Sequence, residues 1–329
     1  MINVVTQMID ESKGVLLLST GSKVAIARAA SKAASKRGLT LHGSDCTKNV
    51  PTRHFVDRFT CFDTSSEGSW IEKLKSYCRE NSISLVIPTR HADLEALANQ
   101  KSSLAKEGIC VAVSDTQTIS ICLDKLATST FFANLSVPSP QTGLVEEAQN
   151  GVIDLQHPLF VKPRFGSAGR GIKEIESKQD LWEYPSDWIA QEKAAGLEYT
   201  INVYVSKKGK CICAIPHQRI LTDGSESVQA RTERIPVLIN WAKRIVEGLP
   251  GAWGPLNIQC FYDREKDRPQ FIEINPRLGG GFPLAHAAKG EFIEWLLQEA
   301  FEESELARFD DWTDQLLMMK YRNAIFDLD

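Results

Sequence analysis

The 329-residue sequence is 43% hydrophobic and 24% charged, with a formal net charge of −4. This weakly acidic balance, with no basic run, argues against a binding surface for DNA or RNA. The longest early apolar run, residues 15–18, is too short for a membrane span or a signal-peptide core. The 8 cysteines are scattered and form no C-x-x-C pair, which argues against a zinc site or a disulfide framework. We therefore expect a cytoplasmic protein of two or three packed units that binds neither nucleic acid nor membrane.

Short apolar runs alternate with amphipathic stretches in the first third of the chain. Strands are expected at 14–19, 39–43, 84–88 and 109–113, and helices at 23–37, 70–81 and 92–98. Such alternation indicates a doubly wound parallel sheet. The first turn, STGSKVA, has a lone Gly21 in place of G-x-G-x-x-G, so dinucleotide binding is disfavoured. Asp45 could contact a ribose, but a turn acid is the plainer interpretation.

The pattern changes near Asp115, where we place a domain boundary. A helix is expected at 124–135, before the proline-punctuated segment VPSPQTGL, and further helices at 233–249 and 290–301. Strands of a largely antiparallel sheet are expected at 157–163, 171–175, 187–192, 198–206, 210–220, 256–263 and 269–276. Together with the first third, these elements predict a protein that is α/β and then α+β.

The segment FVKPRFGSAGRGI, residues 160–172, contains a strand and then a glycine-rich turn. Gly166, Gly169 and Gly171 lack a Cβ, so backbone N–H groups there could approach an anion, and Lys162 adds a positive charge. No G-K-[ST] follows, so this is not a Walker loop. A glycine-rich hairpin with an exposed lysine is the alternative.

The segment FIEINPRLGGG, residues 271–281, places Ile272 and Ile274 on one face of a strand and Glu273 and Asn275 on the other. Two oxygen ligands at i and i+2 could chelate a hard cation such as Mg²⁺, with Gln259 of the preceding strand as a third. Arg277 then suits phosphoryl oxygens. The alternative is that the polar pair covers the wet face of an edge strand.

Three further segments carry weaker signals. In AQEKAAGLEYT, residues 190–200, backbone groups near Lys193 and Ala194 could bind an adenine edge and Glu198 a ribose, although a charged hairpin turn is the commoner meaning. His217 and Arg219 share one strand face, and either could bind a substrate carboxylate or acyl phosphate. Arg219 is the favoured candidate, although an ordinary polar sheet face is the plainer interpretation. The polar residues 222–232 predict a mobile lid.

In this order, the segments LDKLATSTFF, VPSP, FVKPRFGSAGRGI, QEKAAGLEYT, LNIQCFY and FIEINPRLGGG resemble an ATP-grasp domain, similar to the carbamoyl-phosphate-synthetase-like branch. The resemblance covers residues 115–300, and the preceding sheet resembles the pre-ATP-grasp domain. It implies a pre-ATP-grasp Rossmann-like domain at 1–114, a small lobe with the glycine-rich loop at 115–189, and a large lobe with the metal site at 190–329.

The resemblance also implies a role for each matching residue. The residues implied in ATP binding are Lys125, Lys162, Gly166, Ser167, Gly169, Gly171, Glu192, Lys193, Ala194 and Glu198. Gln259, Glu273 and Asn275 would hold Mg²⁺, or Mn²⁺ in its place. Arg277, with Arg219 and Lys162, would act in catalysis. A neutral Gln259 stands where many ATP-grasp enzymes have a carboxylate, which leaves the number of metal ions open.

These roles imply a ligase that phosphorylates a small-molecule carboxylate with ATP and passes the acyl group to an amine or similar nucleophile. A kinase, a carbamoyl-phosphate-type enzyme and a non-catalytic ATP-binding module are the alternatives. A homodimer is compatible with the resemblance.

Overall fold

The computed structural model describes residues 13–63, 68–166, 169, 171–224, 226–302 and 304–327. These residues form two compact units, one of residues 13–90 and 100–112 and the other of residues 91–99 and 113–327. Ser167 of the predicted phosphate loop lies outside the described residues. Within the described part of the chain, no helix has the length and apolar character needed to span a membrane.

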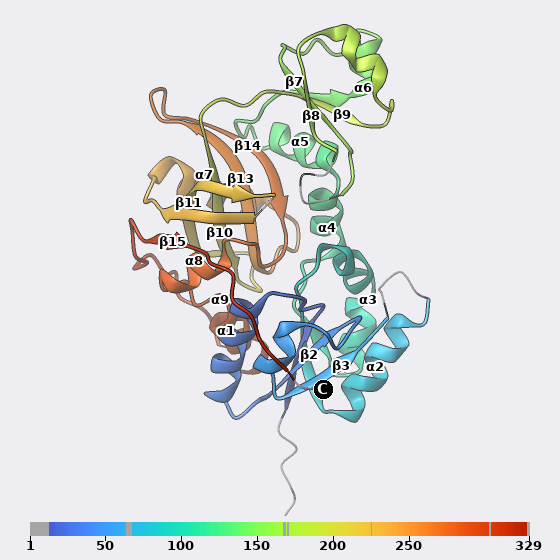
Figure 1. Ribbon diagram of the computed structural model, residues 1–329, viewed down its shortest axis with the longest axis vertical. Helices are drawn as coiled ribbons and strands as arrows, with labels where there is room; N and C mark the ends of the chain where they lie inside the picture. The colour runs from blue at the N-terminus through green and yellow to red at the C-terminus, as the bar shows by residue number, and fades with distance from the viewer. Residues whose placement is uncertain are drawn as a thin grey trace, which may run out of the picture. The chain divides into compact units, whose positions relative to one another are not determined.

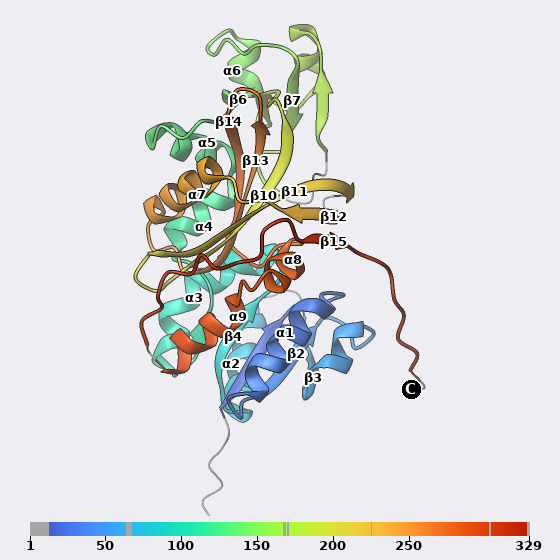
Figure 2. The same cartoon turned by 90° about the vertical axis from the view of Figure 1, so that its left-hand side faces the viewer.

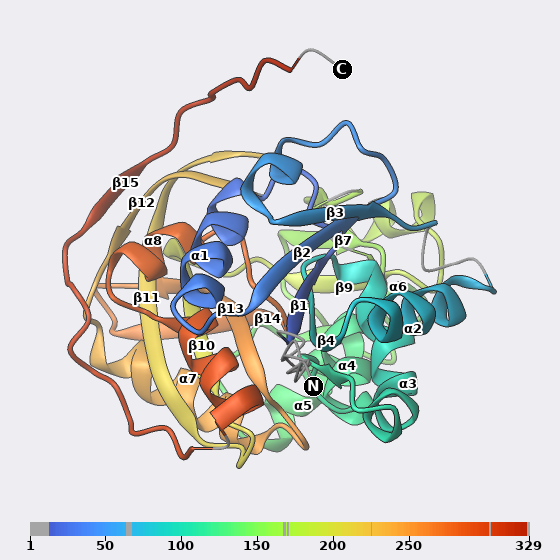
Figure 3. The same ribbon diagram turned by 90° about the horizontal axis from the view of Figure 1, so that it is seen from below.

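The first unit is built on a parallel sheet, as predicted. Its five strands lie in the order β3-β2-β1-β4-β5. They are β1 (Gly14–Leu18), β2 (Thr40–Asp45), β3 (Arg58–Cys61), β4 (Ile83–Pro88) and β5 (Cys110–Val111). All five residues of β1 are buried, which is typical of a central strand covered on both faces. Helix α1 (Val24–Ser35) covers one face and α2 (Trp70–Glu80) covers the other (Figure 3).

Two elements of this unit differ from prediction. Strand β3 was not expected, and α3 (Leu94–Lys106) runs eight residues beyond the predicted end at residue 98. Short 3₁₀ turns precede β3 and α3, η1 (Pro51–Phe55) and η2 (His91–Asp93). The carboxylate of Asp45 accepts hydrogen bonds from the Gly21 N–H at 2.7 Å and from its neighbour Cys46 at 2.8 Å. Asp45 is therefore a turn acid, and the plainer interpretation is confirmed.

The second unit contains a small antiparallel sheet of four strands in the order β6-β9-β7-β8. Its strands are β6 (Thr142–Leu144), β7 (Leu159–Lys162), β8 (Lys173–Ile175) and β9 (Ile189–Glu192). Helix α6 (Val145–Gln149) lies against them (Figure 1), and η3 (Lys178–Glu183) completes the layer. Since β9 pairs with β6 and β7, this sheet extends past the boundary predicted between residues 189 and 190.

A second antiparallel sheet has six strands in the order β14-β13-β10-β11-β12-β15. These are β10 (Leu197–Val205), β11 (Cys211–Asp223), β12 (Glu226–Thr232), β13 (Gly254–Asp263), β14 (Arg268–Asn275) and β15 (Leu317–Met319). Helices α4 (Thr116–Leu123), α5 (Lys125–Asn134) and α7 (Pro236–Gly248) lie on one side of it (Figure 2). Helices α8 (Phe282–Ala287) and α9 (Phe292–Leu297) follow β14, and a π turn spans Gln298–Glu302.

The two faces of this sheet differ in chemistry. Apolar side chains of β10, β13 and β14 form a buried cluster with α5 and α7, in which Ile201, Ile258 and Phe271 are fully buried. The opposite face carries the polar side chains of the predicted site. A sheet with one face buried in this way has its register fixed by the apolar side chains.

A β-bulge in β14 corrects the predicted alternation. The register passes from Cys260 opposite Phe271 to Gln259 opposite Glu273, so Ile272 is the extra residue. Phe271 and Ile274 therefore fill the core, and Ile272, predicted to share the face of Ile274, is only half-buried. Glu273 and Asn275 keep their common face because the bulge precedes both.

The predicted mobile lid is also wrong. Residues 226–232 form strand β12, which pairs with β11 and β15. Ser227, Ala230 and Thr232 are buried, so short side chains pack this strand into the sheet although its composition is polar.

We expect the two neighbouring side chains at the bulge to contribute unequally to stability. Phe271→Ala should lower the free energy of unfolding by about 3–5 kcal/mol because it empties part of the core. Ile272→Ala, the matched control, should cost clearly less. Urea unfolding of both variants measures the difference, and equal losses would contradict the bulge register.

Candidate active site

Glu273 lies where β14 ends, among the predicted metal ligands. Its Oε1 accepts a hydrogen bond of 2.9 Å from the amide of Asn275. Gln259 is directly opposite Glu273 in the β13–β14 pairing, which brings the two Cβ atoms to about 4.5–5.5 Å. The structure thus brings the three predicted ligands together on the polar face of the sheet.

The charge of this carboxylate acts on three basic side chains. Lys162 ends β7, Lys125 begins α5, and Arg277 follows β14. The charge of Glu273 raises the pKa of each, opposing in every case the larger lowering caused by burial. Basic residues from two sheets and a helix are therefore close enough to one acidic side chain for its charge to change their pKa values.

Lys162 is only 7% exposed, so the predicted alternative of an exposed hairpin lysine is wrong. Its ammonium donates a 2.8 Å hydrogen bond to the amide oxygen of Gln191 on β9. Burial lowers the pKa of Lys162 to about 8, Glu273 opposes this shift, and the charge of Lys125 adds to it. A buried ammonium that pairs directly with a neutral amide retains capacity for an anionic partner.

Arg277 has a similar character. Burial lowers its pKa, with Glu273 as the opposing charge. The guanidinium donates to the Leu278 carbonyl at 3.1 Å, and its Nε is buried with no hydrogen-bond partner among the described residues. Buried donors in native proteins are nearly always hydrogen-bonded. A phosphoryl oxygen of a ligand would accept a hydrogen bond from the Nε of Arg277.

Lys125 holds the start of the glycine-rich loop. Its ammonium donates to the carbonyls of Pro163 at 3.0 Å, Arg164 at 3.4 Å and Gly166 at 3.1 Å. Gly166 has a φ of 111°, in the region that favours glycine. Gly169 and Gly171 also have positive φ. The loop that was predicted to cover phosphates is thus tied to a lysine predicted to bind them.

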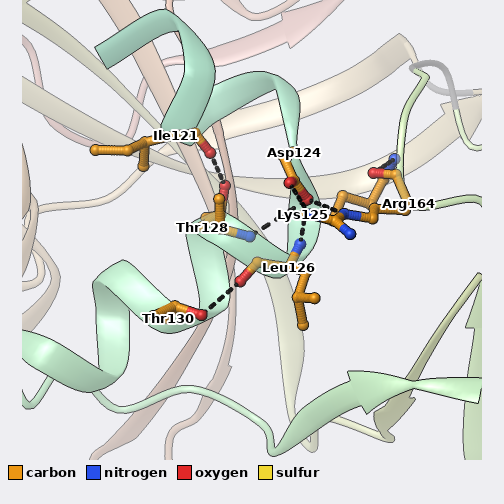
Figure 4. Close-up of polar contacts among 8 residues, drawn as sticks. Ile121, Asp124, Lys125, Leu126, Thr128, Thr130 and Arg164 are labelled. Atoms are coloured by element: carbon orange, nitrogen blue, oxygen red, sulfur yellow. Dashed lines mark hydrogen bonds and ion pairs between the residues drawn. The ribbon is translucent and has the colours of Figure 1, made fainter. Parts of the chain in front are cut away.

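The sequence interpretation missed an ion pair beside this lysine. Asp124 is the N-cap of α5, and its Oδ1 accepts hydrogen bonds from the N–H groups of Leu126 and Ala127 (Figure 4). The same carboxylate binds Arg164 in a bidentate manner, with N···O distances of 2.8 and 2.6 Å. An acidic residue directly before a helix was the available signal for the cap. No signal in the sequence indicated that Arg164, 40 residues away, would be its partner.

The predicted adenine hinge is largely engaged in internal contacts. Glu192 accepts from the Gln156 N–H at 2.9 Å, and the Lys193 N–H donates to the Pro158 carbonyl at 3.2 Å. The ammonium of Lys193 pairs with Glu174. Within the described part of the chain, no hydrogen bond engages the Ala194 N–H, which leaves it as the hinge donor that a base edge could use.

Glu198 and Arg219, predicted for ribose and substrate carboxylate respectively, form an ion pair with each other. Arg219 also donates to the hydroxyl of Ser227 at 3.1 Å. Its side chain is only 6% exposed. The residue predicted to bind the ribose and the residue predicted to bind the substrate carboxylate are therefore in direct contact.

His217 is fully buried beside this pair. Burial lowers its pKa to about 3, and the charges of Arg219 and Lys320 lower it further, so the ring is neutral. A Cβ on Gly281 would come within 2.3 Å of the His217 ring, and one on Gly279 within 2.6 Å of the Asn257 amide. The glycine run after Arg277 thus lets the backbone pack on the polar face.

The residues present fit a magnesium ion bound together with nucleotide. Among the residues that the structure describes, no three His, Cys, Asp or Glu side chains form a metal-binding group. The predicted set offers one carboxylate and two amides. Mg²⁺ commonly uses one or two carboxylates and completes its coordination with substrate phosphates and water.

This arrangement of a small antiparallel sheet with a glycine-rich loop beside a larger sheet with an acidic strand end defines an ATP-grasp fold. The ATP-grasp domain family matches residues 122–281, and the family of PylC-like N-terminal domains matches residues 15–112. Residues 122–281 are therefore an ATP-grasp domain, and residues 15–112 are a PylC-like N-terminal domain.

Three proteins illustrate what this chain is similar to. The C-terminal section of the carbamoyl phosphate synthase large chain from Methanopyrus kandleri is 26% identical over 57% of this chain and 38% of its own length. The 3-methyl-D-ornithine–L-lysine ligase of Methanosarcina mazei is 24% identical over 51% of this chain and 41% of its own. The chain thus spans less than half of either relative.

The third comparison is a solved structure. The biotin carboxylase domain dimer of Hydrogenobacter thermophilus 2-oxoglutarate carboxylase, in complex with MgADP, ADP and bicarbonate, superimposes with a TM-score of 0.73. It covers 90% of this chain and 70% of the other, at 15% identity. At this identity the likeness establishes the fold.

We expect Lys162→Met to weaken ATP binding by about 10- to 150-fold, because one charge-assisted contact is worth about 1.5–3 kcal/mol. Calorimetric titration with ATP measures the loss, and circular dichroism checks the fold. Unchanged affinity in a folded variant would remove Lys162 from the nucleotide site.

The same lysine should make ATP binding pH-dependent. Below pH 8 Lys162 is protonated and binds phosphate, whereas above it the free protein loses this charge, so affinity should fall as the pH rises through about 8. Lys162→Arg keeps its charge at every accessible pH. Affinity measured from pH 6.5 to 9.5 should decline in the wild type more steeply than in this control.

Variants of Asp124 should separate its two contacts. Asp124→Asn keeps a cap acceptor but removes the charge that holds Arg164, so the KM for ATP should change with little loss of stability. Asp124→Ala also removes the cap, which should cost about 1 kcal/mol more in thermal or urea unfolding. If both variants match the wild type in KM, the pair does not govern the loop.

Proposed function

We propose that the chain is an ATP-dependent ligase that activates a carboxylate as an acyl phosphate, releases ADP, and couples the acyl group to an amine or similar nucleophile. The observation that supports it best is that three basic side chains, Lys125, Lys162 and Arg277, lie within the electrostatic influence of the one carboxylate of Glu273. Three cations facing one carboxylate leave a positive excess, which suits a polyphosphate.

Each of the basic residues and the glycine-rich loop has a separate role in this proposal. Lys125 and Lys162 bind the α- and β-phosphates, and the loop from Gly166 to Gly171 covers the triphosphate. Arg277, whose Nε has no partner among the described residues, binds the γ-phosphoryl group as it transfers. Catalysis is positioning and charge neutralisation, without a side-chain nucleophile.

Gln259, Glu273 and Asn275 hold the metal. When bound, Mg²⁺ supplies further neutralisation of the phosphate charges. The Asn275–Glu273 hydrogen bond keeps both oxygen ligands on one face.

Two further expectations belong to this proposal: adenine binds at the Lys193–Ala194 backbone, and the enzyme acts on small molecules. The similar Hydrogenobacter domain was solved as a dimer, which supports a homodimer of this chain.

Bicarbonate is a second candidate for the carboxylate. The similarity to a carbamoyl phosphate synthase, and to a carboxylase domain solved in complex with MgADP, ADP and bicarbonate, supports it. The ligase that joins methylornithine and lysine supports an amino acid instead. Both possibilities share the same first step, phosphoryl transfer to a carboxylate oxygen.

Product analysis tests the proposed reaction. With its carboxylate present, the enzyme should release ADP and phosphate, because the lysines hold the α- and β-phosphates while the γ-phosphorus is attacked. ¹⁸O in the carboxylate should appear in the phosphate, and hydroxylamine should trap the acyl group as a hydroxamate. AMP as product would indicate an acyl adenylate, and ADP without oxygen transfer would overturn the ligase assignment.

Glu273→Gln tests the role of the carboxylate, and Glu265→Gln is its matched control. It keeps the side-chain shape but removes the carboxylate, so turnover should fall below detection and excess Mg²⁺ or Mn²⁺ should restore it in part. Glu265→Gln, in the exposed turn between β13 and β14, makes the same charge change and should leave turnover unchanged.

A further inference from the structure

A histidine that has no role in the proposed reaction lies in the same unit as the basic residues that do. His91 begins η2, the short turn before α3, and belongs to the second unit. Its ring is half-buried and lines a cavity of about 350 Å³ together with Asp124 and Gly166. The carbonyl of Gly166, at the start of the glycine-rich loop, accepts a hydrogen bond from Lys125. The cavity therefore borders both His91 and the base of this loop.

The charge environment of the His91 ring is positive. Burial lowers the pKa of His91, and the charge of Arg277 lowers it further. Glu273 opposes this shift, whereas Lys125 adds to it. Of these three charges, that of Arg277 has the largest effect on the ring. The imidazole is therefore neutral at pH 7 and lies in a field that favours an anionic ligand.

The two ring nitrogens of His91 differ in their surroundings. Nδ1 is buried and has no hydrogen-bond partner among the described residues. A neutral imidazole carries one N–H, and an unpaired buried N–H is rarer in proteins than an unpaired acceptor. The proton therefore belongs on Nε2. Within the described part of the chain, no residue accepts a hydrogen bond from Nε2, so this N–H is available to a ligand.

Arg277 has a donor of the same kind. Its Nε is buried with no partner among the residues that the structure describes. Arg277 and His91 thus come from segments far apart in the chain, influence each other electrostatically, and each have a donor without an acceptor. The transferring phosphoryl group has three peripheral oxygens, so it can accept a hydrogen bond from both.

We propose that His91 is a further catalytic residue, whose neutral ring donates a hydrogen bond from Nε2 to the γ-phosphoryl group of ATP. The contact is made to bound ATP and is kept while the carboxylate oxygen bonds to the γ-phosphorus. The bond from this phosphorus to the bridging oxygen then breaks, and ADP leaves with that oxygen. His91 retains its proton and stabilises the charge of the transferring group. This inference rests on the proposed function, but nucleotide binding measures the contact without turnover.

The test compares two nucleotides that differ in the γ-phosphoryl group. MgADP and the magnesium complex of the β,γ-imido analogue of ATP are titrated calorimetrically into the wild type and into His91→Phe, which keeps a ring but has no donor. The variant should bind the analogue about tenfold or more weakly, and MgADP within about twofold of the wild type, because it loses one hydrogen bond to a charged group. A merely structural role would weaken the binding of both nucleotides alike.

Two more conservative variants identify the nitrogen. The amide nitrogen of glutamine lies close to the position of imidazole Nε2, whereas that of asparagine lies closer to Nδ1. His91→Gln should therefore recover most of the affinity for the analogue, and His91→Asn should resemble His91→Phe. His54→Phe removes an exposed imidazole from η1 in the first unit and is the matched control, which should leave both affinities unchanged. Circular dichroism checks that each variant is folded.

The inference is wrong if folded His91→Phe binds the analogue as tightly as the wild type, if it loses affinity for both nucleotides equally, or if asparagine restores binding and glutamine does not. In each case, carboxylate-dependent ADP release by the wild type, followed in parallel, would leave the proposed ligase reaction standing. Selective loss of the analogue without such ADP release would uphold the contact and reject the ligase reaction. A wild type that binds neither nucleotide would overturn both.

Discussion

The central constraint in the second unit is electrostatic: the charge of the Glu273 carboxylate opposes the effect of burial on the pKa values of Lys125, Lys162 and Arg277. Burial disfavours the charged form of each cation, and one acid cannot balance three bases. Folding alone therefore leaves this region with an excess of positive charge and with a guanidinium Nε of Arg277 that has no partner among the described residues. An anionic ligand that carries several charges would balance the positive charge and accept a hydrogen bond from the Nε. The energetic cost of burying these three cations is therefore better explained by ligand binding than by stability.

Backbone features hold this group in place. The bulge at Ile272 turns Glu273 and Asn275 to the polar face while Phe271 and Ile274 stay in the core. After Arg277, glycines let the chain pass close to Asn257 and His217. A side chain at Gly281 would displace the His217 ring, and with it the wall of the site. The predicted metal ligands and the core side chains are thus positioned by the same few residues.

The sequence predicted what is encoded locally. Period-two spacing placed Glu273 and Asn275 on one face, and the glycine-rich run after Lys162 marked the loop. It could not predict the Asp124–Arg164 pair, because nothing in either segment indicates a partner 40 residues away. Polar composition suggested a lid at 222–232, but the strand is held by pairing on both sides. Tertiary pairing overrode local composition there.

The contacts of Lys125 connect the loop to the proposed nucleotide site. Its ammonium binds three backbone carbonyls, which are neutral acceptors, whereas a phosphate offers charged oxygens. Hydrogen bonds between two charged groups are stronger than those to neutral carbonyls. A phosphate that reaches Lys125 would therefore displace the carbonyls and release this part of the loop. The ion pair of Arg164 with Asp124 lies outside that exchange, so it can keep the base of the loop anchored while the glycines rearrange around the triphosphate.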